Sequence, residues 1–425
     1  MDQFVIQGSK KLRGEIDARG AKNAAFPLLA ATLLTKEDCV IRNLPLIEDV
    51  HRTIEILQSM GAKVDWIGER AVKINTKNAD PKKISKNLMI QLRGSVLFFG
   101  PLLGRFKKAA LPQPGGCVIG ARPIDTHLDA FSQLGVQIHP KGEGFDMEFS
   151  GTLKANQVIL NEFSVTATEN ILLFASLLGK PVNIKVADLD YQVQELISVL
   201  RKMGVKVSLS GHHAIVVKGK KQLRGFDHFL MYDPIEAGTF ILLALASKGM
   251  ISVKNVELQF LELFLKKLKD FGASLEITKD AKGRGTVKVM PSTLFIDKIQ
   301  SFIYPGIHSD LQSPLGVLAT QTRGSTLLHD PLYEGRLKYL EELVKMGAEI
   351  YFADPHRALI NGPTKLYGTN LGTFDLRGGA ALIIAALIAE GKSTIQNAYQ
   401  VDRGYEKIEE RLQKLGADIK RVKKP

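Results

Sequence analysis

The sequence contains only two cysteines, Cys39 and Cys117, and a single tryptophan, Trp66, among its 425 residues. So few cysteines exclude a disulfide scaffold and favour a reducing compartment. The longest apolar runs, such as 380–389, reach about half the length of a bilayer span. The first residues, MDQFVIQGSKKLRG, include no apolar stretch of signal-peptide length. We therefore expect a soluble cytoplasmic protein without membrane attachment.

Carboxylates are fewer than cations: 44 Asp and Glu stand against 57 Lys and Arg, which gives a net charge of +13. Such an excess suits either nucleic acid or small anionic substrates. Nucleic-acid binding favours basic residues clustered on one face together with aromatic side chains. Aromatics make up only 7 %, and the basic residues are spread along the chain apart from the tail 420–424. On charge alone, both classes of partner remain open.

One pattern recurs six times along the chain. It consists of an amphipathic helix, a glycine, a small residue and then alternating apolar positions, as in LQSMGAKVDW and LVKMGAEIYF. The six glycines, spaced 74, 69, 68, 75 and 69 residues apart, are Gly61, Gly135, Gly204, Gly272, Gly347 and Gly416. Glycine directly after a helix adopts the left-handed conformation at least cost. The pattern thus predicts six units of about 70 residues, each helix ending at its glycine.

A nearly all-apolar segment precedes the amphipathic helix in every unit, as in FILLALASKG and LIIAALIAEG. A helix that is apolar on all sides is buried. We expect an α/β protein with two similar domains, each of three units whose buried helices are enclosed by sheets. The predicted domains are 22–231 and 1–21 with 232–425, with the active site in the cleft between them. The opening strand, 3–7, can pair with either domain. A solenoid is disfavoured because its repeats span about 20–50 residues.

Cations occur where predicted helices begin, although a helix N-terminus carries partial positive charge. Three precede buried helices and three precede amphipathic helices: Lys22, Arg93 and Arg377, then Arg122, Arg336 and Arg403. Any one of them is explained as a solvated surface residue. Six at matching positions indicate a site for a multiply charged anion, where side-chain cations and helix N–H groups converge.

Two further side chains are candidates for chemistry. Cys117 lies in the Gly/Pro-rich loop LPQPGGCVIGARP near Arg122, where a thiol is either reactive or simply buried. Cys39 lies in a strand pattern, so we expect it to be buried and inert. Asp310 precedes the fifth buried helix and is either a helix cap or a general base. No HExxH, CxxC or Walker motif is present, and we expect no metal and no cofactor.

Four segments resemble the enolpyruvyl transferase family: GAKNAA, PGGCVIGARPIDTH, DLRGGAAL and DRGYEKIEERLQKLGA, which are 20–25, 114–127, 375–382 and 402–417. The resemblance runs from residue 1 to 422. It implies two domains of three repeated units each. It also implies transfer of the enolpyruvyl group of phosphoenolpyruvate to the 3′-hydroxyl of UDP-N-acetylglucosamine, with release of phosphate, in peptidoglycan synthesis.

The resemblance also assigns roles to residues of this chain. Cys117 would be the acid and Asp310 the base, and Arg377 would close the two lobes. Phosphoenolpyruvate would be held by Lys22, Arg122 and Arg403. The remaining substrate-binding positions would be Asn23, Arg93, Pro123, Ile124, Asp125, Thr126, Glu162, Phe163, Ser164, Val165, Leu332 and Arg336, together with Asp310 and Arg122. Partners would be the two substrates, with no nucleic acid and no obligate protein partner.

The sequence departs from the family pattern at three places near these residues. Glu162 stands where the family often has a lysine, an Asp190-Tyr191-Gln192 segment replaces an EPE-like one, and Pro234 stands in a DRIE-like segment at the arginine position. A different acceptor such as shikimate 3-phosphate therefore remains an alternative. A basic, repeat-type nucleic-acid-binding protein is the alternative from another class.

Overall fold

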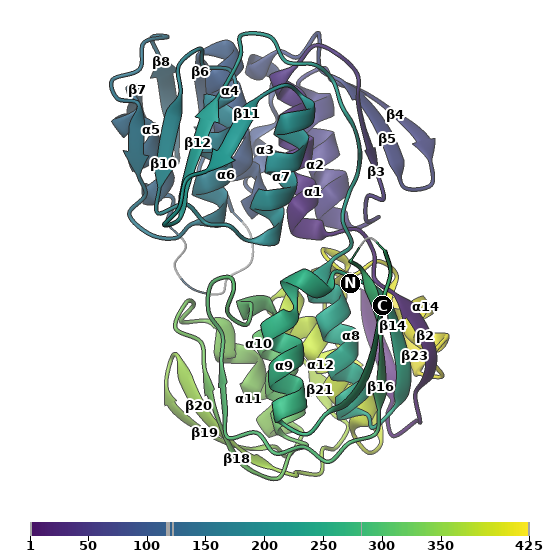
Figure 1. Cartoon of the computed structure of the whole chain (residues 1–425). Helices are drawn as coiled ribbons and strands as arrows, with labels where there is room; N and C mark the ends of the chain where they lie inside the picture. Colours follow the sequence, from purple (N-terminus) through teal and green to yellow (C-terminus); the bar gives the residue numbers. More distant parts are fainter. Residues whose placement is uncertain (1, 116–119, 121–122, 282, 424–425) are drawn as a thin grey trace. The chain divides into compact units, whose positions relative to one another are not determined.

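A computed structural model describes residues 2–115, 120, 123–281 and 283–423 and divides the chain into two compact units. The terminal unit contains both chain ends, with residues 2–19 and those from 232 onward; the middle unit contains 20–115 and 123–231 (Figure 1). The chain passes between the units at Arg19/Gly20 and at Met231/Tyr232. The predicted domains, 22–231 and 1–21 with 232–425, and the cleft between them stay predictions.

The middle unit contains three sheets in the part of the chain that the structure describes. In spatial order, the first is β13 (Asp227–Phe229), β3 (Cys39–Arg42), β5 (Ala71–Asn75) and β4 (Lys63–Gly68). The second is β6 (Lys108–Pro112), β8 (Gly144–Phe149) and β7 (Val136–Lys141). The third is β11 (Lys206–Leu209), β12 (Ala214–Lys218), β10 (Val182–Lys185) and β9 (Gln157–Ile159).

The terminal unit repeats this plan. Its sheets, in spatial order, are first β15 (Ser274–Lys279), β16 (Gly285–Met290), β14 (Met250–Val256) and β2 (Arg13–Asp17), and second β17 (Lys298–Gln300), β18 (Gly324–His329), β20 (Arg357–Gly362) and β19 (Glu349–Asp354). The last is β21 (Asn370–Leu371), β22 (Lys392–Ile395), β1 (Asp2–Gln7) and β23 (Asp418–Lys423). Strands bury alternate residues toward the helices, as β16 does with Val287 and Val289.

The opening strand β1 belongs to the terminal unit, which resolves the choice that the sequence left open. It lies between β22 and β23 and runs antiparallel to both, with Phe4 opposite Ile395 and Arg421. In other sheets, the corresponding strand is the second strand of a hairpin, for example β5 after β4. The N-terminus thus completes the sixth repeat and joins the two ends of the chain.

Six helices form the cores of the two units, as the apolar segments predict. They are α1 (Lys22–Ala31), α4 (Phe99–Phe106) and α6 (Val165–Ala175) in the middle unit, and α8 (Pro234–Ala246), α10 (Gln312–Ala319) and α12 (Leu376–Ile388) in the terminal unit. All thirteen residues of α8 are buried. Burial of each large apolar side chain stabilises the fold by roughly 1.5–3 kcal/mol. Among the described residues, no helix is both long and apolar enough to cross a membrane.

The amphipathic helices cover these cores, and their glycines behave as predicted. The helices are α2 (Glu48–Ser59), α5 (Asp125–Gln133), α7 (Tyr191–Lys202), α9 (Glu262–Asp270), α11 (Tyr339–Lys345) and α14 (Ile408–Gln413). The six repeat glycines all have φ between 93° and 98°. The remaining short helices are α3 (Lys86–Met89) and α13 (Tyr399–Asp402), with 3₁₀ turns η1 (Thr32–Leu34), η2 (Pro81–Lys83), η3 (Arg93–Phe98), η4 (Leu258–Phe260), η5 (Ser309–Leu311) and η6 (Arg336–Lys338).

Candidate active site

The N-terminal halves of the three buried helices pack together in the middle unit. A Cβ at Gly94, in η3, would lie 3.1 Å from the Phe26 ring in α1. Asn170, in α6, accepts a hydrogen bond from the Gly100 N–H at 2.8 Å and donates to the Val96 carbonyl at 3.0 Å. The first N–H groups of a helix have no acceptor within the helix and carry partial positive charge. Three such ends close together favour an anion.

Lys22 is the first residue of α1, and its charge is compensated. Its Nζ lies 3.0 Å from Asp49 Oδ2 and 5.7 Å from the centroid of the Phe26 ring. Both partners of the ion pair are buried. A buried pair of this kind is weak evidence for stability, because desolvation offsets much of the attraction. Asn23 follows in the same turn and is half-buried. The arrangement holds an ammonium group at the start of a buried helix.

Arg93 connects the start of η3 to the segment 123–126. Its Nη2 donates to the Pro123 carbonyl at 3.1 Å. Ile124 is buried while Asp125, the first residue of α5, is exposed. The buried Thr126 donates from Oγ1 to Glu162 Oε1 at 3.1 Å. The structure therefore brings the predicted segments 123–126 and 162–165 together.

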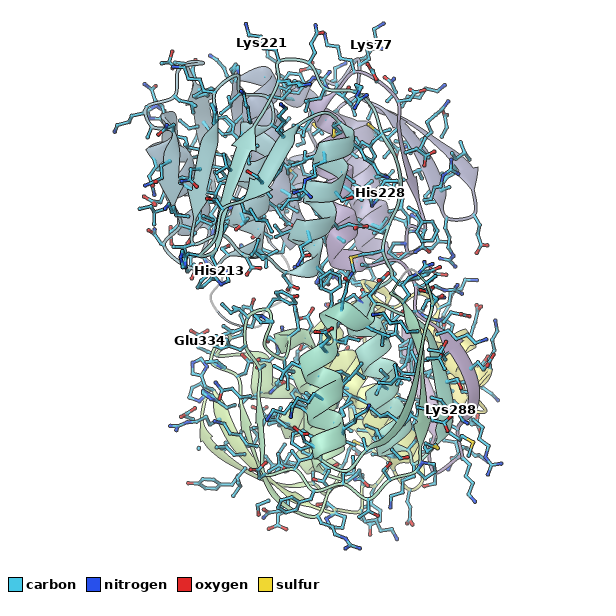
Figure 2. All side chains as sticks on the ribbon, viewed as in Figure 1. Lys77, His213, Lys221, His228, Lys288 and Glu334 are labelled. Atoms are coloured by element: carbon cyan, nitrogen blue, oxygen red, sulfur yellow. The ribbon has the colours of Figure 1, made fainter. Side chains whose placement is uncertain are left out.

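The segment 162–165 forms the entrance to α6. Ser164 is the N-cap and accepts from the Ala167 N–H at 3.3 Å, and Val165 is the first helical residue. Phe163 is exposed and packs edge-on against His213, labelled in Figure 2, with ring centroids 4.8 Å apart. The Glu162 carboxylate places a negative charge beside this helix end.

The terminal unit has a matching set of helix ends. A Cβ at Gly238, in α8, would lie 2.7 Å from the Leu311 side chain in η5, which leads into α10. Arg377, near the start of α12, donates from Nε to Asp310 Oδ2 at 3.1 Å. The N-termini of α8, α10 and α12 are therefore neighbours, as are those of the middle unit.

Asp310 bridges two buried arginines. Arg336 Nη2 lies 2.9 Å from its Oδ1, and Arg377 occupies its Oδ2. Burial disfavours the charge of Arg336, but Asp310 and Asp375 outweigh it and raise the pKa of the guanidinium above its ordinary value. Asp310 is not the helix cap considered above, because the side chain that accepts at this end is His308 Nδ1, from the Asp310 N–H at 3.0 Å. The cap of α12 is Asp375, which accepts from the N–H groups of Arg377 and Gly378.

Sequence reasoning missed several polar residues around this bridge. Asp330 is fully buried and accepts hydrogen bonds from Ser309 Oγ at 2.7 Å and from the Leu332 N–H at 2.9 Å. The second bond holds the backbone of Leu332, a predicted substrate-binding residue that is half-buried. Tyr405 Oη lies 3.1 Å from Arg377 Nη1 and 3.0 Å from Thr239 Oγ1 in α8. No spacing in the sequence signals the contacts between side chains, because their partners are 21 to 166 residues apart.

The expectation that Arg403 begins an amphipathic helix is wrong. Arg403 follows the four-residue helix α13 as its C-cap and lies five residues before α14, rather than at the start of an amphipathic helix. A cation at a helix C-terminus is favourable. Its Nη1 donates to Gln400 Oε1 at 3.3 Å, and the side chain is buried. The neighbouring Gly404 lies against Leu376, since a Cβ there would be 2.5 Å from that side chain. Arg403 is thus close in sequence to groups that contact the start of α12.

The two cysteines are treated differently by the structure. Cys117 and Arg122 lie outside the described residues, so their roles stay predictions. Cys39, in β3, is fully buried, and burial raises the pKa of its thiol to about 12. The expectation that Cys39 is a buried core residue is confirmed, and its inertness stays a prediction.

Comparisons with known proteins agree with this architecture. The family model described as EPSP synthase (3-phosphoshikimate 1-carboxyvinyltransferase) matches residues 6–412. The enolpyruvyl transferase NikO from Streptomyces tendae has a TM-score of 0.89 at 23 % identity, covering 100 % of this chain and 99 % of its own. EPSP synthase from Acinetobacter baumannii has a TM-score of 0.78 at 18 % identity, with both chains fully covered. The chain therefore belongs to the EPSP synthase family of enolpyruvyl transferases.

Within this family, full-length relatives carry a more specific name. A UDP-N-acetylglucosamine 1-carboxyvinyltransferase from Treponema denticola is 39 % identical over 99 % of both chains. One from Elusimicrobium minutum is 40 % identical, again over 99 % of both chains. The resemblance drawn from the four sequence segments is confirmed.

Proposed function

We propose that the chain transfers the enolpyruvyl group of phosphoenolpyruvate to the 3′-hydroxyl of UDP-N-acetylglucosamine and releases phosphate, in the synthesis of peptidoglycan. The observation that carries this proposal is the full-length identity of 39–40 % to two enzymes of that name. The geometry supports it, because each unit has converging N-termini of buried helices with cations beside them. Both substrates are multiply charged anions, which such ends favour.

The reaction needs an acid, a base and cations. A proton adds to the methylene carbon of phosphoenolpyruvate and leaves an oxocarbenium-like centre at the neighbouring carbon. The sugar hydroxyl attacks that centre and loses its proton to a base. The intermediate then loses a methyl proton as the bond to the phosphate oxygen breaks, which restores the double bond. We assign the acid to Cys117 and the base to Asp310, with Lys22, Arg122 and Arg403 holding phosphoenolpyruvate.

The two arginines hold Asp310 in place for this role. Arg336 Nη2 donates to one oxygen of the carboxylate and Arg377 Nε donates to the other. The arginines also fix the orientation of the carboxylate. Arg377 is proposed to act in closure of the lobes and Arg336 in binding of substrate.

The middle unit is proposed to hold the nucleotide sugar. Arg93 and the segments 123–126 and 162–165 already contact one another there. Asn23 lies beside Lys22 at the start of α1. The Glu162 carboxylate cannot pair with a phosphate, so donors to the diphosphate have to come from neighbouring groups.

The family also includes enzymes named for 3-phosphoshikimate, which is the second candidate acceptor. Phosphate release should be measured with phosphoenolpyruvate and either UDP-N-acetylglucosamine or shikimate 3-phosphate. We expect release with the nucleotide sugar alone. Release only with shikimate 3-phosphate would replace the proposed acceptor, and release with neither would overturn the proposed reaction. Both proposed substrates are cytoplasmic metabolites, so we also propose a cytoplasmic location, without nucleic acid, membrane or obligate protein partner.

A further inference from the structure

Asn170 has an orientation that the backbone determines. It is fully buried in α6, and its Oδ1 accepts from the Gly100 N–H while its Nδ2 donates to the Val96 carbonyl. A flipped amide would set an N–H against an N–H and an oxygen against an oxygen. The second hydrogen of Nδ2 therefore points to His127 Nδ1, which lies 2.9 Å away.

This contact fixes the tautomer of His127. Its Nδ1 accepts from Asn170, so the hydrogen is on Nε2, which lies 3.1 Å from Thr166 Oγ1. Burial, and then the charge of Arg93, lower the pKa of His127 to about 3. His127 is thus an imidazole that is uncharged near neutral pH and donates a hydrogen bond to Thr166.

Thr166 is left with one unused hydrogen. Its Oγ1 accepts from His127, and its own hydroxyl hydrogen has no acceptor among the described residues. The side chain is half-exposed at the second position of α6, where the first backbone N–H groups also lack helical acceptors. A helical threonine commonly donates to the carbonyl four residues earlier, but the structure contains no such bond from Thr166 to Glu162.

We propose that Thr166 is a further substrate-binding residue, whose hydroxyl donates to the diphosphate of the nucleotide sugar, and that His127 and Asn170 are its positioning residues. The inference rests on the proposed function. The positive charge of Arg93 acts on His127, whose pKa it lowers. The N-terminus of α6 also favours an anion. Glu162 is a like charge beside this site, with its carboxylate accepting from Thr126. A neutral hydroxyl supplies a donor here without adding another charge.

The direct test compares Thr166→Val with Thr166→Ser. Valine keeps the shape and removes the hydroxyl, whereas serine keeps the donor. Calorimetric titration with UDP-N-acetylglucosamine should show binding about 10- to 100-fold weaker for the valine variant, the range of a hydrogen bond to a charged group. The serine variant should stay within about 3-fold of the parent. The KM for the nucleotide sugar should rise in the valine variant while the KM for phosphoenolpyruvate stays unchanged.

The positioning role is tested with His127→Leu in both backgrounds. It should weaken binding of UDP-N-acetylglucosamine in the parent and add little in Thr166→Val, because both changes remove the same donor. The affinity ratio of parent to Thr166→Val should be constant between pH 6 and 9. A fall of this affinity ratio below pH 7, where a charged His127 would explain it, would overturn the positioning role of His127. If His127→Leu does not fold, the Thr166 pair and its pH profile decide alone.

The outcomes separate the two proposals. Thr166→Val with parental affinity overturns the inference and leaves the reaction intact. Loss of affinity in both Thr166 variants with a lowered melting temperature indicates a structural role and also overturns it. A parent protein that neither binds UDP-N-acetylglucosamine nor releases phosphate with it overturns the proposed function, independently of any variant.

Discussion

The two units place cations at buried helix ends but balance them differently. In the terminal unit, two buried arginines share the carboxylate of Asp310, with Asp375 3.8 Å from Arg336. In the middle unit, Lys22 pairs with Asp49, and Arg93 donates to the Pro123 carbonyl. The terminal site is a dense charged network, whereas the middle site depends on neutral groups such as Asn170 and His127.

This difference indicates different tolerance to change. Removing one member of a buried ion pair leaves an uncompensated charge and costs about 3–5 kcal/mol. Removing a neutral hydrogen-bond partner costs about 1–3 kcal/mol. We therefore expect changes in the charged network of the terminal site to impair folding and catalysis together, and changes in the neutral contacts of the middle site to weaken binding with less loss of stability.

The largest effect is expected for Asp310→Asn. It leaves Arg336 and Arg377 without their shared carboxylate, so the free energy of unfolding should fall by about 3–5 kcal/mol. Loss of the base should lower kcat by about 10²–10⁴. Urea unfolding and steady-state kinetics measure the two effects. Asp297→Asn, an exposed change in the same unit, is the control. Parental kcat in a folded Asp310→Asn protein would show that this carboxylate is purely structural.

Lys22→Met should lower both stability and turnover. Asp49 loses this buried ion pair, which we expect to cost about 3–5 kcal/mol, while kcat/KM for phosphoenolpyruvate should fall by about 10²–10³. Lys36→Met, at an exposed position in the loop after η1, is the control. Adding Asp49→Asn should recover stability but not activity. A variant that loses stability and keeps its kcat/KM would remove Lys22 from the site.

The cysteines give a third contrast, between a proposed acid and a core residue. Fosfomycin, the epoxide that alkylates the family's loop cysteine, should modify Cys117 and spare Cys39, because the raised pKa of Cys39 leaves almost no thiolate at pH 8. Cys117→Asp should retain partial activity and resist the epoxide, since a carboxylic acid still donates a proton. Peptide mass mapping with UDP-N-acetylglucosamine present tests both expectations. Label on Cys39 would contradict the assignment.

Much of the fold could be predicted because its signals are local. Each repeat glycine follows an amphipathic helix, and all six have the expected left-handed φ. The pairing of β1 could not be predicted, because its partners Ile395 and Arg421 are about 400 residues away in sequence and two domains offered equivalent edges. The short helix α13 has too few residues for a periodic pattern, which explains the error at Arg403.

The site was predictable as a set of residue types but not as a set of pairs. Repetition marked Arg336 and Arg377 as cations near helix starts, and the structure places both there. Their common partner Asp310 is 26 and 67 residues away, a separation that no spacing rule connects. Likewise, nothing local indicates that Asn170 determines the tautomer of His127. Such pairs depend on tertiary packing of separate repeats.

The smallest expected effect is a gain in stability from Glu169→Gln in the middle unit. Glu169 is buried in α6; burial, and then the charges of Asp188 and Asp190, raise the pKa of its carboxyl well above the ordinary value. The folded state therefore binds this proton more tightly than the unfolded state. Stability from it is complete below the unfolded pKa of about 4.3 and is lost as pH rises through the folded pKa.

Glutamine has a similar shape and never ionises, so the variant should avoid that loss. The difference in melting temperature between Glu169→Gln and the parent should widen as pH rises from 5 to 8, by about 2–4 °C for each kcal/mol gained. The exposed Glu162→Gln, at the same helix end, should show no such widening. A parent that is more stable than Glu169→Gln at every pH would mean that the ionised carboxylate has a favourable partner. In that case the middle unit would depend on charge as strongly as the terminal unit does.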